Sequence, residues 1–131
     1  MEASGTSKQE DTSSQESIAA QTSQAKNEIQ NVSVDDVSAM LKDKNKYFLL
    51  DVRTQEEYDD GFIENSILIP VAELESRLSE IPSDKPIIVY CRSGSRSLQA
   101  AQILIKNNFN PVYNMLGGIT EWVKSGYPVV K

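Results

Sequence analysis

The chain has 131 residues, a net charge of −6 at neutral pH and a sequence pI of about 4.6. This acidic balance argues against binding to nucleic acid or to anionic membranes, since both need clustered Lys and Arg. There is one cysteine, Cys91, and no histidine. The chain therefore lacks the residues for an internal disulfide, a C-x-x-C pair, a cysteine- or histidine-based metal site, a Cys–His protease or a Ser–His–Asp triad.

No apolar segment is long enough to span a bilayer, so we expect no membrane span. The first residues also lack the basic and apolar regions of a signal peptide. The compartment stays open. The sequence fits a cytoplasmic protein, and it equally fits an exported or lipid-anchored protein whose upstream signal has been removed.

Residues 1–30 are predicted to form a disordered polar tail or linker, and residues 31–131 the folded domain. The tail is rich in Ser, Thr, Gln, Glu and Lys, with only isolated apolar residues such as Ile18 and Ile29. Such a segment buries too little surface to offset the entropy of ordering it. A weak helix over Ser17–Ile29 is the alternative.

The first half of the domain carries two helix-start signals around one apolar strand. Ser33 begins an N-cap pattern with acids in the first turn, and the helix that follows runs through Leu41. The continuous apolar run Tyr47–Val52 predicts a strand buried on both faces. Thr54 then opens a capping box for a short helix that ends near Gly61.

The second half alternates short strands and helices, which indicates crossover connections and a parallel sheet with helices on both faces. We expect ligands beyond the carboxyl ends of such strands, where Asp51 and Cys91 lie. The predicted elements are a strand over Ser66–Pro70, a helix over Leu74–Glu80, a strand over Ile87–Tyr90, a helix over Ser97–Asn107, a strand over Pro111–Met115, a turn at Leu116–Gly118 and a helix over Ile119–Lys124.

The segment from Cys91 to Ser97 is the candidate catalytic loop, between an apolar strand and a helix. A cysteine here lies among converging backbone N–H groups at the positive end of the helix dipole. Arg92 and Arg96 add positive charge, and Gly94 can turn loop N–H groups inward, so we expect a lowered thiol pKa. The alternative is a buried structural cysteine, which the polar neighbours disfavour.

The spacing of the loop separates two chemistries for a thiolate in an anion-binding cup. Cysteine phosphatases need C-x5-R, but here Arg96 gives C-x4-R and Ser97 occupies the phosphatase position. The shorter loop favours transfer of a sulfane sulfur through a persulfide over attack on phosphorus. Phosphatase or arsenate reductase chemistry, and a non-catalytic binding module, stay open as alternatives.

Several motifs in this order resemble the single-domain rhodanese family over about Val32 to Val130. The resemblance implies a rhodanese-like three-layer α/β sandwich with a five-stranded, mainly parallel sheet and helices on both faces. It also implies a thiosulfate sulfurtransferase that passes sulfur from a small anionic donor to cyanide or a thiol acceptor, which could be a protein thiol. The motifs are Asp51–Tyr58, Gly61-Phe62-Ile63, Ile67–Pro70, the loop Cys91–Ser97, and Leu116–Ile119 with Trp122.

The resemblance also assigns roles to individual residues. It implies Cys91 as the catalytic thiolate and Arg92 and Arg96 as cations that attract the sulfite part of the donor. Asp51 is expected to brace the loop, and Arg53 to pair with an acid such as Glu57. The expected protein is a monomer without cofactor or metal. Backbone N–H groups that would hold the persulfide come from Arg92, Ser93, Gly94, Ser95, Arg96 and Ser97.

One departure concerns the wall beside the site. Many relatives have a histidine where this chain has Phe62, and Gly-Ala where it has Asn65-Ser66. That histidine is not the nucleophile, so activity can survive, but the donor preference is left open. A second hypothesis is therefore a persulfide carrier or partner-binding module with little turnover.

Overall fold

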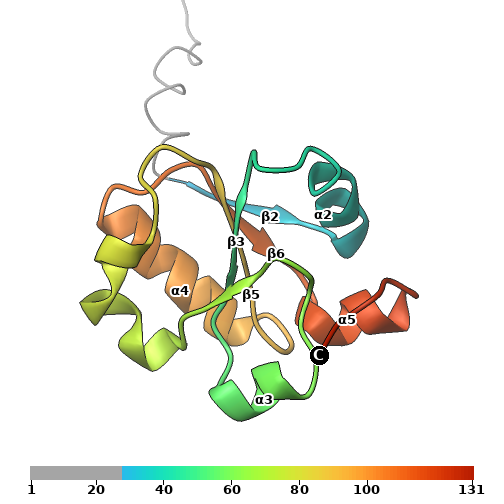
Figure 1. Cartoon of the computed structure of the whole chain (residues 1–131). Coiled ribbons are helices and arrows are strands. Elements are labelled where there is room, and N and C mark those ends of the chain that lie inside the picture. Colours follow the sequence, from blue (N-terminus) through green and yellow to red (C-terminus); the bar gives the residue numbers. More distant parts are fainter. Residues whose placement is uncertain (1–27) are drawn as a thin grey trace, which may run out of the picture.

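Short apolar strands form the centre of the structure, a computed structural model that describes residues 28–131 (Figure 1). They lie in the order β2-β6-β5-β3-β4, and every neighbouring pair is parallel. All four positions of β5 are buried, which explains its unbroken Ile-Ile-Val-Tyr sequence. The strands are β2 (Ile29–Val32), β3 (Phe48–Asp51), β4 (Ile67–Leu68), β5 (Ile87–Tyr90) and β6 (Val112–Met115).

Helices cover both faces of the sheet and give the predicted three layers (Figure 1). One face packs against α4 (Ser95–Lys106) and the other against α2 (Val34–Met40) and α5 (Gly118–Lys124). Neighbouring residues of a strand point to opposite faces, so Val89 of β5 joins the α4 side while Ile88 joins the other. The α/β fold predicted from the sequence is confirmed.

The segment predicted as one helix over Leu74–Glu80 is instead two short 3-10 helices, η1 (Val71–Ser76) and η2 (Leu78–Glu80). Arg77 lies between them with φ −124°, outside the helical region, and this interrupts the helix. The strand predicted over Ser66–Pro70 is also shorter, because only Ile67 and Leu68 pair with β3.

The sheet begins slightly earlier than predicted. Ile29 lies in the segment assigned to the polar tail, yet it starts β2, pairs with Val112 and packs against the α4-side core. Residues 1–27, with most of the alternative helix over Ser17–Ile29, lie outside the described residues. Among residues 28–131, no helix has the length and apolar character needed to cross a membrane.

Candidate active site

Two loops meet at the carboxyl edge of the sheet. Strand β3 ends at Asp51 and β5 ends at Tyr90, and these two residues lie opposite each other in the parallel pairing. Cys91 follows β5 directly, and α4 begins at Ser95 after Gly94 as its N-cap. The short helix α3 (Gln55–Asp59) lies at the same edge, after β3 (Figure 1). Asp51 and Cys91 lie at the carboxyl ends of two strands, as predicted, and the structure shows that these strands are neighbours.

The thiol of Cys91 is enclosed by hydrogen-bond donors. Only 1 % of the residue is exposed, and the Gly94 N–H donates to Sγ over 3.0 Å. Gly94 has φ +120°, where side-chain-bearing residues are strained. Burial by itself would raise the pKa of the thiol, but hydrogen bonds from the Ser97 hydroxyl and from the N–H groups of Ser97, Gly94 and Ser93 lower the pKa below its ordinary value. The site therefore favours the thiolate.

The start of α5 fixes the other side of this loop. Ile119 N–H donates to the Cys91 carbonyl over 2.9 Å, and Thr120 N–H donates to the Arg92 carbonyl over 3.1 Å. Gly118 lies so close that a Cβ there would collide with both carbonyls. The first residues of α5, directly after the predicted turn at Leu116–Gly118, thus bind the carbonyls of the cysteine loop.

Arg96 is bound by a carboxylate from α3. Its Nη1 and Nη2 donate to the two Glu57 oxygens over 2.8 and 3.0 Å. Glu57 also accepts the Thr54 N–H as part of the predicted capping box. The Arg96 hydrogen bond is the main reason that the Glu57 pKa falls from 4.5 to about 2, against burial that raises it.

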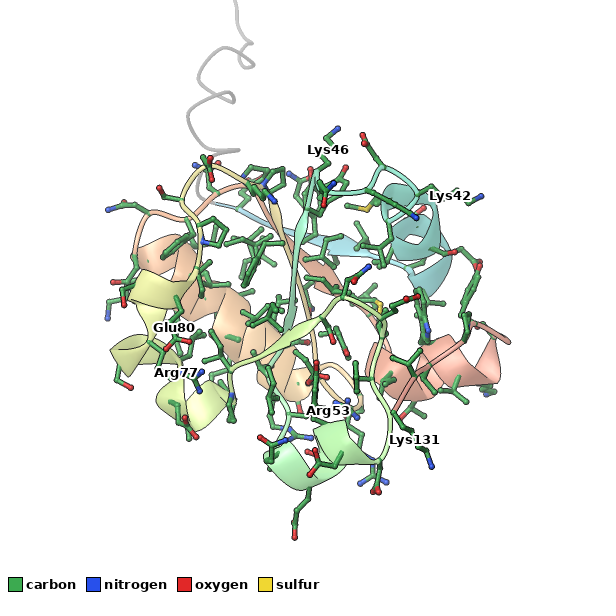
Figure 2. All side chains as sticks on the ribbon, viewed as in Figure 1. Lys42, Lys46, Arg53, Arg77, Glu80 and Lys131 are labelled. Atoms are coloured by element: carbon green, nitrogen blue, oxygen red, sulfur yellow. The ribbon has the colours of Figure 1, made fainter. Side chains whose placement is uncertain are left out.

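Arg53 pairs with an acid, as expected, but the acid is Asp51, and the suggested partner Glu57 is wrong. Arg53 turns back to Asp51, with Nη2 2.7 Å from Oδ2 and Nε 3.0 Å from both carboxylate oxygens. Nη2 also donates to the Gly61 carbonyl over 2.7 Å. Asp51 is fully buried and Arg53 is nearly so, at the end of the sheet where α3 lies (Figure 2).

Asp51 therefore stabilises the β3–α3 connection. Within residues 28–131, the hydrogen bonds that its carboxylate accepts come from Arg53, and none comes from the Cys91 loop. The physical reason is proximity. Arg53 follows Asp51 by two positions, and its side chain folds back over the end of the strand. Glu57 therefore pairs with Arg96 instead.

Sequence reasoning missed Asn114, a buried polar residue in β6. The Ser97 hydroxyl donates to Asn114 Oδ1 over 2.6 Å and also lies 3.0 Å from the Gly94 carbonyl. Asn114 Nδ2 in turn donates to Asn31 Oδ1 over 3.1 Å. The available signal was an amide inside an otherwise apolar strand, since a buried polar group needs partners.

Comparison with known proteins accounts for this arrangement. Residues 33–125 match the rhodanese-like domain family. The chain belongs to this family. A sulfurtransferase of Allochromatium vinosum is 35 % identical over 102 residues, covering 78 % of this chain and 95 % of its own. A thiosulfate sulfurtransferase of Coxiella burnetii is 33 % identical over 88 residues, covering 67 % and 81 %.

A solved structure agrees with the same assignment. The crystal structure of a rhodanese-related protein from Thermoplasma volcanium has a TM-score of 0.71 and 36 % identity, and the match covers 77 % of this chain and 97 % of that one. The fold and the sulfurtransferase family are thus shown.

A groove of about 500 Å³ lies beside the cysteine loop of this rhodanese-like domain. Arg92 borders it, is exposed, and forms no ion pair with another residue of 28–131. Val123, 52 % exposed, and Val129 give the groove an apolar side. The groove therefore combines an available cation with apolar surface next to the loop.

The domain has Phe62 at the edge of this region. Its ring stacks on Tyr58 with centroids 4.1 Å apart and planes 7° from parallel. Its backbone pairs with Val130 through two hydrogen bonds of 2.8 and 2.9 Å. Phe62 thus fastens the C-terminal segment beside the groove and offers no ring nitrogen.

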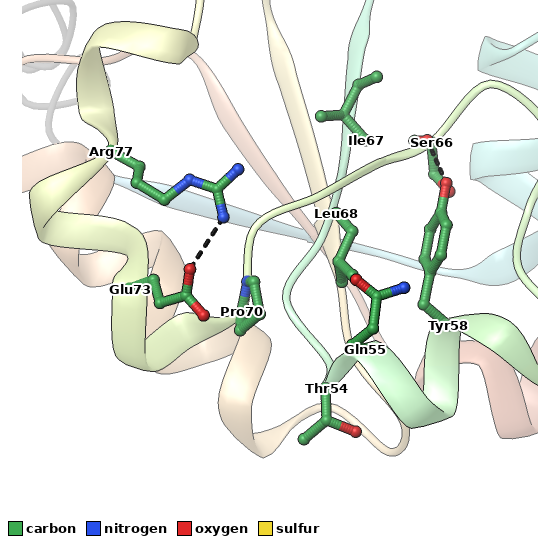
Figure 3. Close-up of a pocket in the computed structure, with 9 residues that line it drawn as sticks. All are labelled: Thr54, Gln55, Tyr58, Ser66, Ile67, Leu68, Pro70, Glu73 and Arg77. Atoms are coloured by element: carbon green, nitrogen blue, oxygen red, sulfur yellow. Dashed lines mark hydrogen bonds and ion pairs between the residues drawn. The ribbon is translucent and has the colours of Figure 1, made fainter.

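Another cavity, of about 450 Å³, lies between α3, β4 and η1 (Figure 3). Arg77 and Glu73 point toward each other in it, and Glu80 binds the same guanidinium. No residue of the cysteine loop lines this cavity. Within residues 28–131, no cluster of three or more Cys, Asp or Glu side chains could hold a metal ion. The candidate active site is therefore the Cys91 loop with its adjoining groove.

Proposed function

We propose that this domain transfers a sulfane sulfur from thiosulfate, or a similar small anionic donor, through a persulfide on Cys91. The observation that carries the proposal is the ring of donors around Sγ, in which Gly94 N–H lies 3.0 Å away. Such donors stabilise the thiolate before the reaction and a negatively charged outer sulfur after it.

The first half-reaction is attack by the Cys91 thiolate on the outer sulfur of thiosulfate. A new sulfur–sulfur bond forms, the sulfur–sulfur bond of the donor breaks, and sulfite leaves with the electron pair. The product is a persulfide whose outer sulfur carries the negative charge. The loop N–H groups that lower the pKa of the thiol, including that of Ser93, are donors for this charge.

In the second half-reaction, an acceptor attacks the outer sulfur of the persulfide. Cyanide yields thiocyanate, and a thiolate yields a new persulfide. In both cases the bond between the two sulfurs breaks, and the electron pair returns to Cys91 as a thiolate. No oxidant or reductant is consumed, which agrees with a chain that has a single cysteine.

The structure supports different roles for the two loop arginines. Arg96 is neutralised by Glu57, so we assign it to holding α3 against α4. Arg92 is exposed beside the groove, so we assign it to attracting the sulfite end of the donor. Long-range attraction of this kind acts through the charge and weakens with salt.

A persulfide carrier with little turnover is the second candidate. The observation that favours it is the apolar side of the groove at Val123 and Val129, which suits a partner surface better than a small anion. Phosphatase chemistry has less support, because Arg96 is held by Glu57 and the loop is one residue short.

The decisive experiment is mass spectrometry of the purified protein after thiosulfate treatment, followed by a thiocyanate assay with cyanide. We expect a gain of one sulfur atom on Cys91 and its loss on adding cyanide. Cys91→Ser and Cys91→Ala should abolish both, while Ser83→Ala, an exposed hydroxyl before β5 and so at the other end of that strand from Cys91, should change neither. Full turnover by Cys91→Ser would refute the mechanism.

The same assay separates the alternatives. Sulfur loading with slow cyanide turnover but rapid transfer to a protein thiol would indicate the carrier. Phosphate release from an aryl phosphate, with no sulfur loading, would replace sulfur chemistry by phosphatase chemistry.

A further inference from the structure

A line of three polar side chains runs from the cysteine loop across the sheet to its edge. Asn31 and Asn114 lie opposite each other in the β2–β6 pairing, and Asn114 lies opposite Val89 of β5. Paired residues of parallel strands point to the same face. Val89 belongs to the α4-side core, so both amides face α4, where Ser97 stands in the first turn.

The hydroxyl of Ser97 has one proton and more than one acceptor. Asn114 Oδ1 lies 2.6 Å away and the Gly94 carbonyl 3.0 Å away. While Asn114 Nδ2 donates to Asn31, its Oδ1 faces Ser97 and takes that proton. In this arrangement the single proton is directed to Asn114, whereas the hydrogen bond from the same hydroxyl that lowers the pKa of the Cys91 thiol needs that proton directed to the sulfur, which is a second arrangement.

We propose that Asn31 and Asn114 are positioning residues that decide whether the Ser97 hydroxyl donates to the Cys91 sulfur. A thiolate is a stronger acceptor than an amide carbonyl and draws the proton toward itself. Ser97 Oγ and Asn114 Oδ1 would then be two acceptors in contact. Rotation of the Asn114 amide removes this conflict, because Nδ2 then donates to Ser97.

Asn31 makes this rotation possible. After Asn114 turns, its Oδ1 faces Asn31, which must donate through its own Nδ2. Asn31 is exposed at the edge strand, so it can rotate against water, whereas Asn114 is only 2 % exposed. Each amide has both a donor and an acceptor, so the chain of bonds is complete in either direction.

The test fixes the direction of the chain with a carboxylate, which only accepts. Asn31→Asp should hold Asn114 Nδ2 toward position 31 and keep the Ser97 proton away from the sulfur. We expect the pKa of the thiol to rise by about one unit, which lowers the alkylation rate about tenfold below that pKa. The measurement is the pH profile of iodoacetamide alkylation of Cys91, and it uses no sulfur donor.

Gln30→Asp is the matched control, since it adds the same charge one position away on the opposite face of β2. It should leave the profile unchanged. In a Ser97→Ala background, Asn31→Asp should also have no effect, because the hydroxyl is gone. An equal shift in either case, or an unchanged profile for Asn31→Asp alone, would overturn the proposal.

Nuclear magnetic resonance of the unmodified chain gives a readout that needs no variant. The side-chain ¹⁵NH₂ signals of Asn31 and Asn114 should shift with pH at the same midpoint as the titration of the thiol, and signals that do not shift with pH would contradict the proposal.

The substitutions at positions 30, 31 and 97 do not change the charged groups of the elements around the thiol. These groups are Asp51 and Arg53 at the end of β3, Glu57 of α3, Arg92 and Arg96 of the loop and α4, and Glu121 of α5, which lies against Gly117.

The inference rests on the proposed function only in taking Cys91 as the nucleophile. Alkylation and resonance shifts report the thiol itself, while sulfur loading reports the transfer reaction. A domain that loads sulfur but shows no effect of Asn31→Asp would refute the positioning role alone. A domain that shows the effect but loads no sulfur would refute the sulfurtransferase alone.

Discussion

The buried pair Asp51–Arg53 should be the most sensitive electrostatic feature of this domain. Arg53→Met keeps most of the side-chain volume but removes the hydrogen bonds to the Asp51 carboxylate and to the Gly61 carbonyl. The carboxylate then keeps only the backbone N–H of residue 53, at 2.9 Å, while remaining 0 % exposed. Stranding one member of a buried pair costs about 3–5 kcal/mol.

That loss is large beside the roughly 5–15 kcal/mol by which domains are usually stable. Urea unfolding followed by fluorescence of the buried Trp122 measures it. Asp51→Asn with Arg53→Met removes both charges, so the double variant should lose at least about 1 kcal/mol less than the sum of the single variants. A cost below about 1 kcal/mol for Arg53→Met, or additive losses, would refute the reasoning.

Arg77→Met is the matched control for this experiment. Arg77 also contacts two carboxylates, those of Glu73 and Glu80. These three side chains are 32 %, 55 % and 49 % exposed, respectively. Exposed pairs contribute little to stability because water and salt screen them. We therefore expect almost no change in the urea midpoint, and a large change would show that burial is not the deciding factor.

Two further predictions concern the contacts around the loop. Glu57 has a folded pKa of about 2 against 4.5, so its pair with Arg96 should stabilise the domain above pH 4.5 and lose that effect as the pH falls toward 2. Glu57→Gln should cost about 1 kcal/mol near neutral pH in urea titrations, and this cost should shrink as the pH falls toward 2. Gly118→Ala should push the Arg92 and Cys91 carbonyls away, costing about 2 kcal/mol or more and slowing alkylation of Cys91; normal stability and reactivity would contradict this.

Local sequence signals predicted the elements of the fold well where neighbours along the chain decide the outcome. The predicted N-cap at Ser33 and the predicted capping box at Thr54 both form, and both use residues three positions apart. The run Ile87–Tyr90 is apolar throughout because both faces of β5 are covered. The position of Cys91 after that strand follows directly. The failed helix over Leu74–Glu80 shows the limit, since apolar spacing does not distinguish an α-helix from two 3-10 turns.

Ion-pair partners could not be predicted, because they depend on how distant elements approach. Glu57 and Arg96 are 39 positions apart, and only the packing of α3 beside α4 brings them together. The sequence offered Arg53 as the nearer partner for Glu57, but Asp51 lies closer still to Arg53 and is buried with it. Asn114 was missed for a similar reason, since its partners Ser97 and Asn31 lie on two other elements.

The site separates the two electrostatic tasks that sulfur transfer requires. The charge on Cys91 is stabilised by neutral dipoles, namely the N–H groups of the loop and, when its proton is directed to the sulfur, the Ser97 hydroxyl. A cation in direct contact would also bind the departing sulfite and slow its release, whereas dipoles act only at the sulfur. Arg92 is exposed at the groove, and under the proposed mechanism it attracts the donor without holding the product. Because Glu57 neutralises Arg96, the proposed mechanism assigns stabilisation of the sulfur to the dipoles and attraction of the donor to Arg92 alone.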